Sequence, residues 1–388
     1  LMNQFSFYMP AKVLYGPGQI SRLHEEELPG NKALIVISAG QSAKKYGYLS
    51  CLEKQLERAN KEYVVFDQVR PNPSRENVMS GALMARVNKC DFVVALGGGS
   101  VMDCGKCIAL MVRNEGDIWD YSLSRLGGKK APKYPAIPII AITTSAGTGS
   151  EVDKAAVISD DDINEKTGIF FPSMFPSISV VDSDLMMSIT PRYTAYQGMD
   201  ALFHATESMI NKNEHMMGEM FALKAIELIS QYLPIAYKDG TNKEARANMA
   251  LASSLAAYYM LCTSEHTMEH VMGSYHPKLI HGAGLIMIAK EYYSFFAKRG
   301  VAEEAMIKMA KAMGVRNPSS SQDFIEALEK LISVVGCAEL KMSDEGISKE
   351  ELKLYPKRLH EVLGGDIMAD PILLTDDDYL EIFEKSYK

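Results

Sequence analysis

Short apolar runs alternate with helical patterns along the first half of the chain. The runs are rich in Val and Ile and are bounded by Gly, Pro, Asn or Asp, which is typical of strands buried on both faces of a parallel sheet. Between the first three runs, residues 49–59 and 75–88 have the 3.6-residue period of amphipathic helices. This order predicts a doubly wound α/β sheet. The expected strands are Ala33–Ser38, Tyr63–Asp67, Phe92–Leu96, Ile139–Thr143 and Ile178–Asp182.

The pattern changes after about residue 186, where strand-like runs give way to helical periodicity. Thr190 followed by Pro191 is typical of a helix start, because Thr can cap the first turn and Pro is tolerated within it. We therefore expect an α/β domain over residues 1–186 and an all-helical domain over residues 187–388. Helices are expected over residues 192–212, 217–238, 242–263, 283–298, 301–314, 322–334 and 348–364.

Composition narrows the class of protein. A net charge of -8 without a basic patch argues against a nucleic-acid partner. No apolar run approaches the roughly 20 residues that cross a bilayer, and the first residues lack the pattern of a signal peptide. The scattered cysteines fit a reducing, cytoplasmic compartment. We interpret Cys104 and Cys107, a C-x-x-C pair, as small buried residues of one helix rather than a redox pair.

One carboxylate and several histidines gather in the expected helical domain. Asp200 and His204 lie four residues apart and so share a helix face, and the same spacing recurs at His266 and His270. A carboxylate with imidazoles is the ligand mixture of a catalytic divalent metal, intermediate between the preferences of zinc and iron. The candidate ligands are Asp200, His204, His266, His270, His276 and His281.

Two polar loops follow expected strands of the first domain. Residues 97–100 (Gly-Gly-Gly-Ser) open a helix, where free N–H groups and the helix dipole favour a phosphate. The spacing is not G-x-G-x-x-G, so a tight strand-to-helix turn is an equal alternative for this motif alone. Residues 143–151 offer small hydroxyls and amides at another strand end, where ligands bind in such sheets. Together with a metal domain, the loops predict a nucleotide cofactor in a cleft between domains.

These motifs together resemble the iron-dependent (group III) alcohol dehydrogenases, in matching order and spacing over nearly the whole chain. The resemblance implies a dinucleotide-binding α/β domain and a helical metal domain, in the dehydroquinate synthase-like fold, with Fe(II) that zinc sometimes replaces. It places the four metal ligands at Asp200, His204, His266 and His281, and a histidine that does not bind the metal at His270. The matching pieces are residues 71–73, 97–100 with Asp103 and Lys106, 143–148, 198–204, 266–270 and 281–282.

The resemblance also implies a set of residues that contact the dinucleotide. Asp103 falls near the glycine loop, with a solvated helix charge as its alternative role. Lys166 resembles the lysine near the nicotinamide ribose, and a surface lysine beside an acidic run is its alternative. The expected cofactor-binding residues are Ser38, Asn72, Gly97, Gly98, Gly99, Ser100, Asp103, Thr143, Thr144, Thr148 and Lys166.

The chain departs from the family pattern in two places. The first strand ends in Ser38 where NAD-preferring members carry Asp, which would bind the ribose 2′-OH and repel a 2′-phosphate. With Lys44 and Lys45 nearby, this favours NADPH over NADH. The stretch between His270 and His281 is one residue longer than in the propanediol and lactaldehyde branch, so His276 competes with His281 as fourth ligand. We favour His281, because residues 281–284 continue the family pattern.

We therefore expect an NAD(P)-dependent alcohol dehydrogenase that acts on small alcohols, diols or aldehydes by hydride transfer. His270 is the expected proton relay or substrate contact, and a hydrogen bond that orients a metal ligand is its alternative role. A second hypothesis is a dehydroquinate synthase-like lyase, which would need more basic residues near the metal. A third is a binding protein without catalysis, against which the intact ligand set argues. The family suggests a homodimer or a larger homo-oligomer, with no membrane partner.

Overall fold

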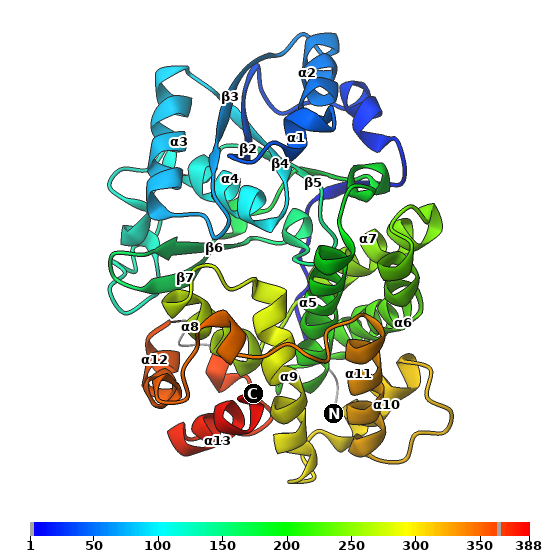
Figure 1. The fold of residues 1–388 in the computed structure, drawn as a ribbon. Coiled ribbons are helices and arrows are strands. Elements are labelled where there is room, and N and C mark those ends of the chain that lie inside the picture. Colours follow the sequence, from blue (N-terminus) through cyan, green and yellow to red (C-terminus); the bar gives the residue numbers. More distant parts are fainter. Residues whose placement is uncertain (1–3, 363–365) are drawn as a thin grey trace. The chain divides into compact units, whose positions relative to one another are not determined.

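The structure, a computed structural model, describes residues 4–362 and 366–388. The chain divides into two compact units, of which one is Tyr8–Ser188 and the other is Ile189–Lys388 with the residues that precede Tyr8. The first unit is α/β and the second is helical (Figure 1). The expected fold class, an α/β N-terminal part followed by an all-helical part, is thereby confirmed.

A parallel sheet of six strands forms the α/β unit. Its strand order is β1-β8-β5-β4-β2-β3, so β1 and β3 lie at the edges. The five expected strands are confirmed to within two residues at each end, and β5 is buried along its whole length. The strands are β1 (Lys12–Tyr15), β2 (Lys32–Ser38), β3 (Glu62–Val69), β4 (Phe92–Gly97), β5 (Ile139–Thr143) and β8 (Ile178–Val181).

Helices cover both faces of this sheet, because successive strand residues point to opposite sides. In β4, Val93 packs with α3 (Arg75–Val87) and α4 (Gly99–Met111), whereas Val94 belongs to the core that contains α2 (Tyr48–Arg58). A side chain at Gly105 of α4 would bring its Cβ to 2.9 Å from that of Ala95, so this glycine permits the helix to approach the sheet closely. A short α1 (Ser42–Lys45) precedes α2.

A second, two-stranded antiparallel sheet was not expected from the sequence. It consists of β6 (Ala155–Asp160) and β7 (Glu165–Phe170). The sequence of β7, EKTGIF, has charged and small residues instead of a Val- and Ile-rich run. Its pairing depends on contacts with other parts of the unit, such as the bond from Trp119 Nε1 to the Glu165 carboxylate (3.3 Å). Local pattern alone therefore gave no strand signal.

The helical unit is built around α5, which contacts several neighbouring helices and is buried at nearly every position from Thr194 onward. A helix that is surrounded on all sides has no polar stripe. The expected helix 242–263 is too long, because α7 ends at Tyr258. Of α8, only the turn from His266 to His270 was expected, and α13 was not expected as a helix. The end of the expected helix 348–364 lies outside the described residues. The helices are α5 (Pro191–Ile210), α6 (Met216–Lys238), α7 (Lys243–Tyr258), α8 (Ser264–Tyr275), α9 (His281–Ala297), α10 (Glu303–Ala312), α11 (Ser321–Val334), α12 (Tyr355–Val362) and α13 (Asp376–Ser386).

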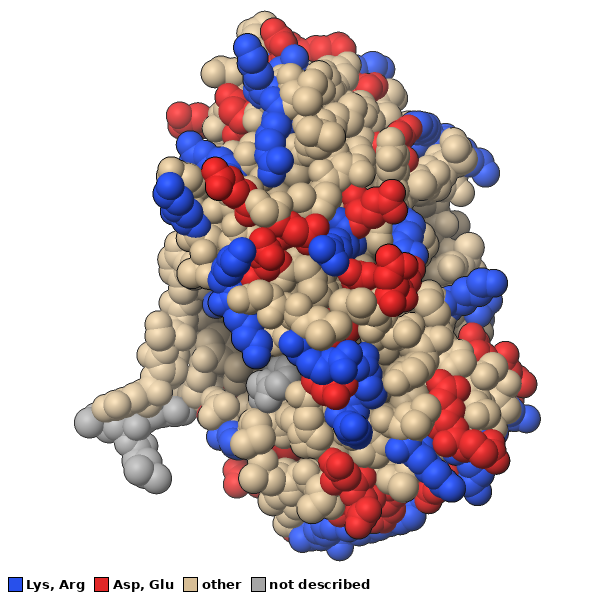
Figure 2. Space-filling model, turned by 90° about the vertical axis from the view of Figure 1, so that its left-hand side faces the viewer, with Lys and Arg blue, Asp and Glu red and all other residues tan. Residues whose placement is uncertain are grey.

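The surface mixes both charges. On the face shown in Figure 2, basic and acidic side chains alternate over short distances. Some form exposed ion pairs, such as Lys44 with Asp67 (2.5 Å) and Arg22 with Glu25 (2.8 Å). Among the described residues, no helix combines the length and the apolar character needed to cross a membrane.

Candidate active site

Three histidines converge on one carboxylate oxygen in the helical unit. The Oδ1 atom of Asp200 lies 3.7 Å from Nε2 of His204, 3.4 Å from Nε2 of His266 and 3.5 Å from Nε2 of His281. Asp200 and His204 are on successive turns of α5, His266 is on the first turn of α8, and His281 is the first residue of α9. The rings of His204 and His266 stack at 4.4 Å. The structure thus brings together the four residues expected as metal ligands.

The donor atoms of this cluster fit a divalent metal. Asp200 Oδ1 and His266 Nε2 are buried and have no hydrogen-bond partner among the described residues. Buried polar atoms are normally paired, so a cluster of such atoms points to a group that completes it. One carboxylate oxygen and imidazole nitrogens match the ligands of zinc and iron. The residues therefore fit the metal that their sequence pattern implies.

Two buried glutamates, which were not predicted from the sequence, bond to the imidazoles of His266 and His281 on the side away from Asp200. Glu207 accepts a hydrogen bond from Nδ1 of His266, and Glu269 accepts one from Nδ1 of His281. With Nδ1 occupied in this way, Nε2 is the nitrogen of each ring that faces Asp200. The sequence carried a weak signal, since Glu207 follows His204 by three residues and Glu269 lies between two candidate histidines.

Glu207 is itself fixed by a buried polar chain. Its Oε2 accepts hydrogen bonds from the backbone N–H and the hydroxyl of Thr263, the latter at 3.0 Å. The Thr263 hydroxyl lies 2.7 Å from the hydroxyl of Tyr292, which donates to Asp370 (2.8 Å). The chain links α5, the start of α8, α9 and the segment before α13. The orientation of His266 therefore depends on four segments of the unit.

The mixture of buried charges shifts the pKa values of the cluster. Burial favours the neutral carboxyl of Asp200, but the neighbouring imidazoles of His204, His281 and His266 hold its pKa well below the usual range. Burial lowers the pKa of His204 to about 4. For His266 and His281, burial is outweighed by Glu207 and Glu269 respectively, together with Asp200, and both pKa values are raised. The cluster therefore favours an anionic Asp200 next to a neutral His204.

The other two candidate histidines, His270 and His276, lie in different surroundings. His270 is buried on α8, with its ring 5.4 Å from that of His281 and 6.3 Å from that of His266. His276 directs its Nε2 to the carboxylate of Glu351 (2.8 Å). Within the described chain, the groups of possible ligands that include Asp200 contain His281 and not His276. The geometry thus favours His281 over His276 as the fourth ligand.

The two polar loops of the α/β unit lie at neighbouring strand ends. The N–H of Thr144 donates to the carbonyl oxygen of Gly97 (3.0 Å), which ties the end of β5 to the end of β4. A Cβ at Gly99 would lie 2.5 Å from the Thr148 side chain, whereas at Gly98 the nearest atom would be Oγ of Ser145 at 3.5 Å. Gly98 therefore leaves space in front of the α4 N-terminus, the position where a phosphate binds.

The second loop is shaped by its own hydroxyls. Thr143, which is buried, donates to the carbonyl oxygen of Ser145 (2.9 Å), and Oγ1 of Thr148 accepts from the N–H of Ser150 (3.3 Å). The Oγ of Ser145 is buried and has no hydrogen-bond partner among the described residues. Ser145 is thus an additional candidate for a phosphate contact. Ser145 lies within residues 143–151, the loop that the sequence predicted to bind the cofactor, but it was not among the expected contacts.

Asp103 and Lys106 join α4 to the start of β6. Lys106 is fully buried and donates to Ser150 Oγ (2.8 Å), Asp153 Oδ1 (2.7 Å) and the carbonyl oxygen of Ala155 (2.8 Å). Asp103 accepts from Ser150 Oγ (2.7 Å) and from the backbone of Val157 (2.9 Å). Three acceptors use all three protons of the Lys106 ammonium group. These side chains therefore hold the two loops together from within the unit.

The other expected cofactor residues lie on separate elements of the α/β unit. Ser38 ends β2 and pairs with Val69, and Asn72 has a positive φ of 52° in the segment after β3. Lys166 lies in β7 and is only 6% exposed, so its alternative role as a surface lysine is wrong. Gly97, Gly98, Gly99 and Ser100 are half-buried at the β4–α4 junction.

Four apolar side chains that are close to the proposed ligands in sequence are buried. These four side chains have no exposed area and pack into the core of the helical unit. The four are Met199, Phe203, Met268 and Met272.

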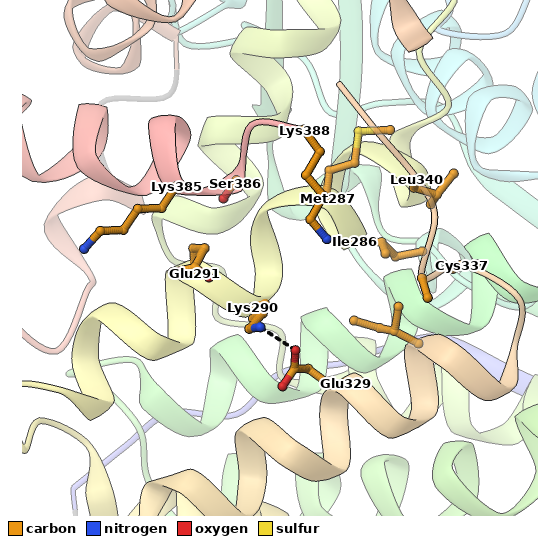
Figure 3. A pocket seen from close by; sticks show the side chains of 12 residues that line it. Ile286, Met287, Lys290, Glu291, Glu329, Cys337, Leu340, Lys385, Ser386 and Lys388 are labelled. Carbon is orange, nitrogen blue, oxygen red and sulfur yellow. Dashed lines mark ion pairs between the residues drawn. The ribbon is translucent and has the colours of Figure 1, made fainter. Parts of the chain in front are cut away.

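A separate cavity of about 250 Å³ lies between α9, α11 and the end of α13 (Figure 3). Its polar rim is paired internally, since Lys290 bonds to Glu329 (2.5 Å) and Lys385 bonds to Glu381. It shares no residue with the histidine cluster. We assign no function to it.

Comparison with known proteins identifies the family. The model of iron-containing alcohol dehydrogenases matches residues 10–183, and that of the C-terminal part of the same family matches residues 194–387. The chain belongs to the iron-containing alcohol dehydrogenase family. It is therefore an oxidoreductase that acts on alcohols with a nicotinamide cofactor, and its metal dependence fits an iron family. This confirms the alcohol dehydrogenase class of the first hypothesis.

Individual relatives cover the whole chain. A 1,3-propanediol dehydrogenase of Klebsiella pneumoniae is 31% identical over 99% of both chains. The NADH-dependent butanol dehydrogenase A of Clostridium acetobutylicum is 30% identical over 100% of both. An archaeal halo-thermophilic alcohol dehydrogenase from a Red Sea brine pool superposes with a TM-score of 0.95 at 30% identity, covering 100% of both chains.

Proposed function

We propose that this alcohol dehydrogenase interconverts small, uncharged aldehydes and primary alcohols or diols, with Fe(II) held by Asp200, His204, His266 and His281. The observation that supports this most is the approach of three Nε2 atoms to within 3.4–3.7 Å of Asp200 Oδ1. The substrate class is supported by two relatives whose names state 1,3-propanediol and butanol. Zinc is an alternative occupant, because it prefers the same nitrogen and oxygen ligands.

The side chains around this site have distinct roles in the proposed reaction. When bound, the metal supplies Lewis acidity toward the substrate oxygen, and the nicotinamide supplies the hydride. Glu207 and Glu269 orient the imidazoles of His266 and His281. His270, one helical turn after His266, is the proposed relay for the proton of the substrate oxygen, and orientation of a neighbouring imidazole is its alternative role.

Residues 1–186 are proposed to bind the dinucleotide and residues 187–388 the metal and substrate. The pyrophosphate is proposed to lie against residues 97–100, where the space in front of Gly98 and the buried Oγ of Ser145 support it. We propose that the protein is a homodimer or a larger homo-oligomer. The remaining contacts with the dinucleotide are proposed from the residues that the family pattern indicates. They are Ser38, Asn72, Asp103, Thr143, Thr144, Thr148 and Lys166.

NADPH is the proposed preferred cofactor. Ser38 lacks the carboxylate that would repel a 2′-phosphate, and the exposed Lys45 lies nearby in sequence. Lys44 contributes less than expected, because it pairs with Asp67. Replacing Ser38→Asp should lower the NADPH-to-NADH ratio of kcat/KM by about tenfold, or roughly 1.4 kcal/mol. Ser50→Asp, on an exposed turn of α2, is the matched control, and an unchanged ratio in Ser38→Asp would refute the role of Ser38.

The function is tested with purified protein that is stripped of metal and reloaded with Fe(II) or Zn(II). Propanal or butanal is added with NADPH or NADH, and oxidation is followed by the absorbance of the reduced nicotinamide. Turnover should require metal and should be lost in Asp200→Ala together with bound Fe(II). Absence of turnover with every short aldehyde, in protein that retains stoichiometric metal, would overturn the proposed substrate class.

A further inference from the structure

A cysteine lies beside two of the proposed metal ligands. Cys262 is in the loop between α7 and α8, and it places its sulfur within reach of His204 and His266. One ligand atom from each of these three residues lies within 4.8 Å of the others. In a tetrahedral zinc site with bonds of about 2.0 to 2.3 Å, ligand atoms are roughly 3.6 Å apart. Closing the present separations requires side-chain shifts of about 1 Å.

The buried imidazole of His204 supports a ligand role on this side. Its Nδ1 is buried and has no hydrogen-bond partner among the described residues. The side chain is 7% exposed, so water does not readily compensate. Cys262 is half-buried. The grouping of the three ligand atoms and the unpaired Nδ1 of His204 are independent observations, and both indicate a site at these three residues.

The two ligand sets compete for one ion. His266 belongs to both sets, and its Nδ1 already donates to Glu207, so Nε2 is the nitrogen that either set can use. Asp200 supplies a hard oxygen to one set, whereas Cys262 supplies a soft sulfur to the other. Soft thiolate ligands select thiophilic metals, and carboxylates favour harder ions.

We propose that His204, Cys262 and His266 form an alternative site for thiophilic divalent metals, which draws the ion away from Asp200 and His281. The sulfur–metal bond forms as the Cys262 thiol releases its proton to the solvent, without any change of oxidation state. The site shares two residues with the proposed catalytic set but does not depend on that set being active. Its consequence is inhibition by zinc or cadmium in excess.

Cadmium alone is the probe. Metal-free full-length protein is titrated with Cd²⁺, and thiolate-to-metal charge transfer is followed in the near ultraviolet while bound cadmium is measured by elemental analysis. The band should appear in the wild type, in Asp200→Ala, and in Cys51→Ser, a control at a cysteine of similar burial in the α/β unit. It should be absent in Cys262→Ser. A band in Cys262→Ser at equal cadmium content, or no band in the wild type, would overturn the proposal.

Inhibition provides a second readout. The Fe(II)-loaded wild type should lose turnover at a Cd²⁺ concentration at least about tenfold lower than Cys262→Ser, each relative to its own uninhibited rate. If Cys262→Ser does not fold, alkylation of the wild type is compared with and without Cd²⁺, and peptide mass spectrometry should show Cys262 protected by the ion. Equal alkylation would sink the alternative site. Turnover without added cadmium tests the proposed function separately.

Discussion

The carboxylate of Glu269 accepts a hydrogen bond from Nδ1 of His281, which lies twelve residues further along the chain. Glu269 belongs to α8 and His281 begins α9, so this bond spans the connection between the two helices. It has a counterpart in the bond between Glu207 and His266. In both pairs a buried anion fixes the imidazole with its Nε2 toward Asp200, which makes the cluster rigid before an ion arrives.

Replacing Glu269→Gln should weaken metal binding by about 10- to 100-fold, because the charge that orients His281 is lost. Affinity is measured by competition with a chelator, and excess Fe(II) should restore turnover. Glu351→Gln is the control, since Glu351 also bonds an imidazole, that of His276, outside the cluster. Equal affinities in the wild type and Glu269→Gln would contradict the orienting role.

The fourth ligand can be identified by two single substitutions. His281→Ala should lower the bound metal well below one ion per chain, because Nε2 of His281 is 3.5 Å from Asp200 Oδ1. His276→Ala should retain full metal content, since His276 bonds Glu351 instead. Elemental analysis after dialysis measures both. Loss of metal in His276→Ala with retention in His281→Ala would reverse the assignment.

Gly98→Ala should weaken dinucleotide binding while leaving the free energy of unfolding nearly unchanged. The backbone φ of −80° suits alanine, and the new Cβ would have 3.5 Å of clearance from the nearest atom. Unfolding should therefore change by no more than about 0.5 kcal/mol. Dinucleotide affinity, measured by fluorescence titration, should fall about tenfold or more because the methyl group occupies the phosphate position.

Gly105→Ala provides the contrast to Gly98→Ala. Its Cβ would lie 2.9 Å from that of Ala95, so the unfolding free energy should drop by about 1–3 kcal/mol. The folded fraction should bind the dinucleotide normally. If Gly98→Ala also binds normally, the glycine loop is not the phosphate site.

Asp103 predicts a pH-dependent contribution to stability. Burial raises the pKa of its carboxyl from 3.8 to about 6, despite Lys106 and hydrogen bonds from Ser150 and the backbone of Val157. The folded protein thus binds this proton more tightly than the unfolded chain. The resulting stabilisation is present in full below about pH 3.8 and is lost as the pH rises through about 6.

Asp103→Asn, which is neutral at every pH, should therefore gain stability relative to the wild type when the pH is raised. The difference in urea unfolding is compared at about pH 4.5 and pH 7.5, on either side of the raised pKa. Asp344→Asn, at an exposed position, should show no such trend. An Asp103→Asn difference that is the same at both pH values would contradict the raised pKa.

The sequence predicted the parts of this protein that depend on local pattern. Runs such as Phe92–Leu96 are buried on both faces, so their apolar character alone marks a strand. The i, i+4 pairing of Asp200 with His204 is fixed by helix geometry and needs no other information. The prediction that His266 and His281 approach Asp200 depended instead on the family resemblance, because these two residues lie on other helices than Asp200.

What the sequence did not reveal depends on contacts between distant segments. Glu207 orients His266, which is 59 residues further along the chain, and no local pattern marks such a partner. The sequence gives no sign that Cys262 is more than a loop cysteine, and only the fold brings it close to His204 and His266. Lys166 lies in a strand that only its tertiary neighbours stabilise. Burial of Met199 and Phe203 was likewise decided by packing around α5 rather than by their proximity to the ligands in sequence.

The exposure of the four proposed ligands is uneven. The side chains of Asp200, His204 and His266 are 4–7% exposed, whereas that of His281 is 26% exposed. Two of the buried residues lie on α5, which is enclosed by other helices and cannot shift without disturbing the core. We therefore expect His281, which begins α9, to be the ligand that shifts most readily when an ion binds or leaves.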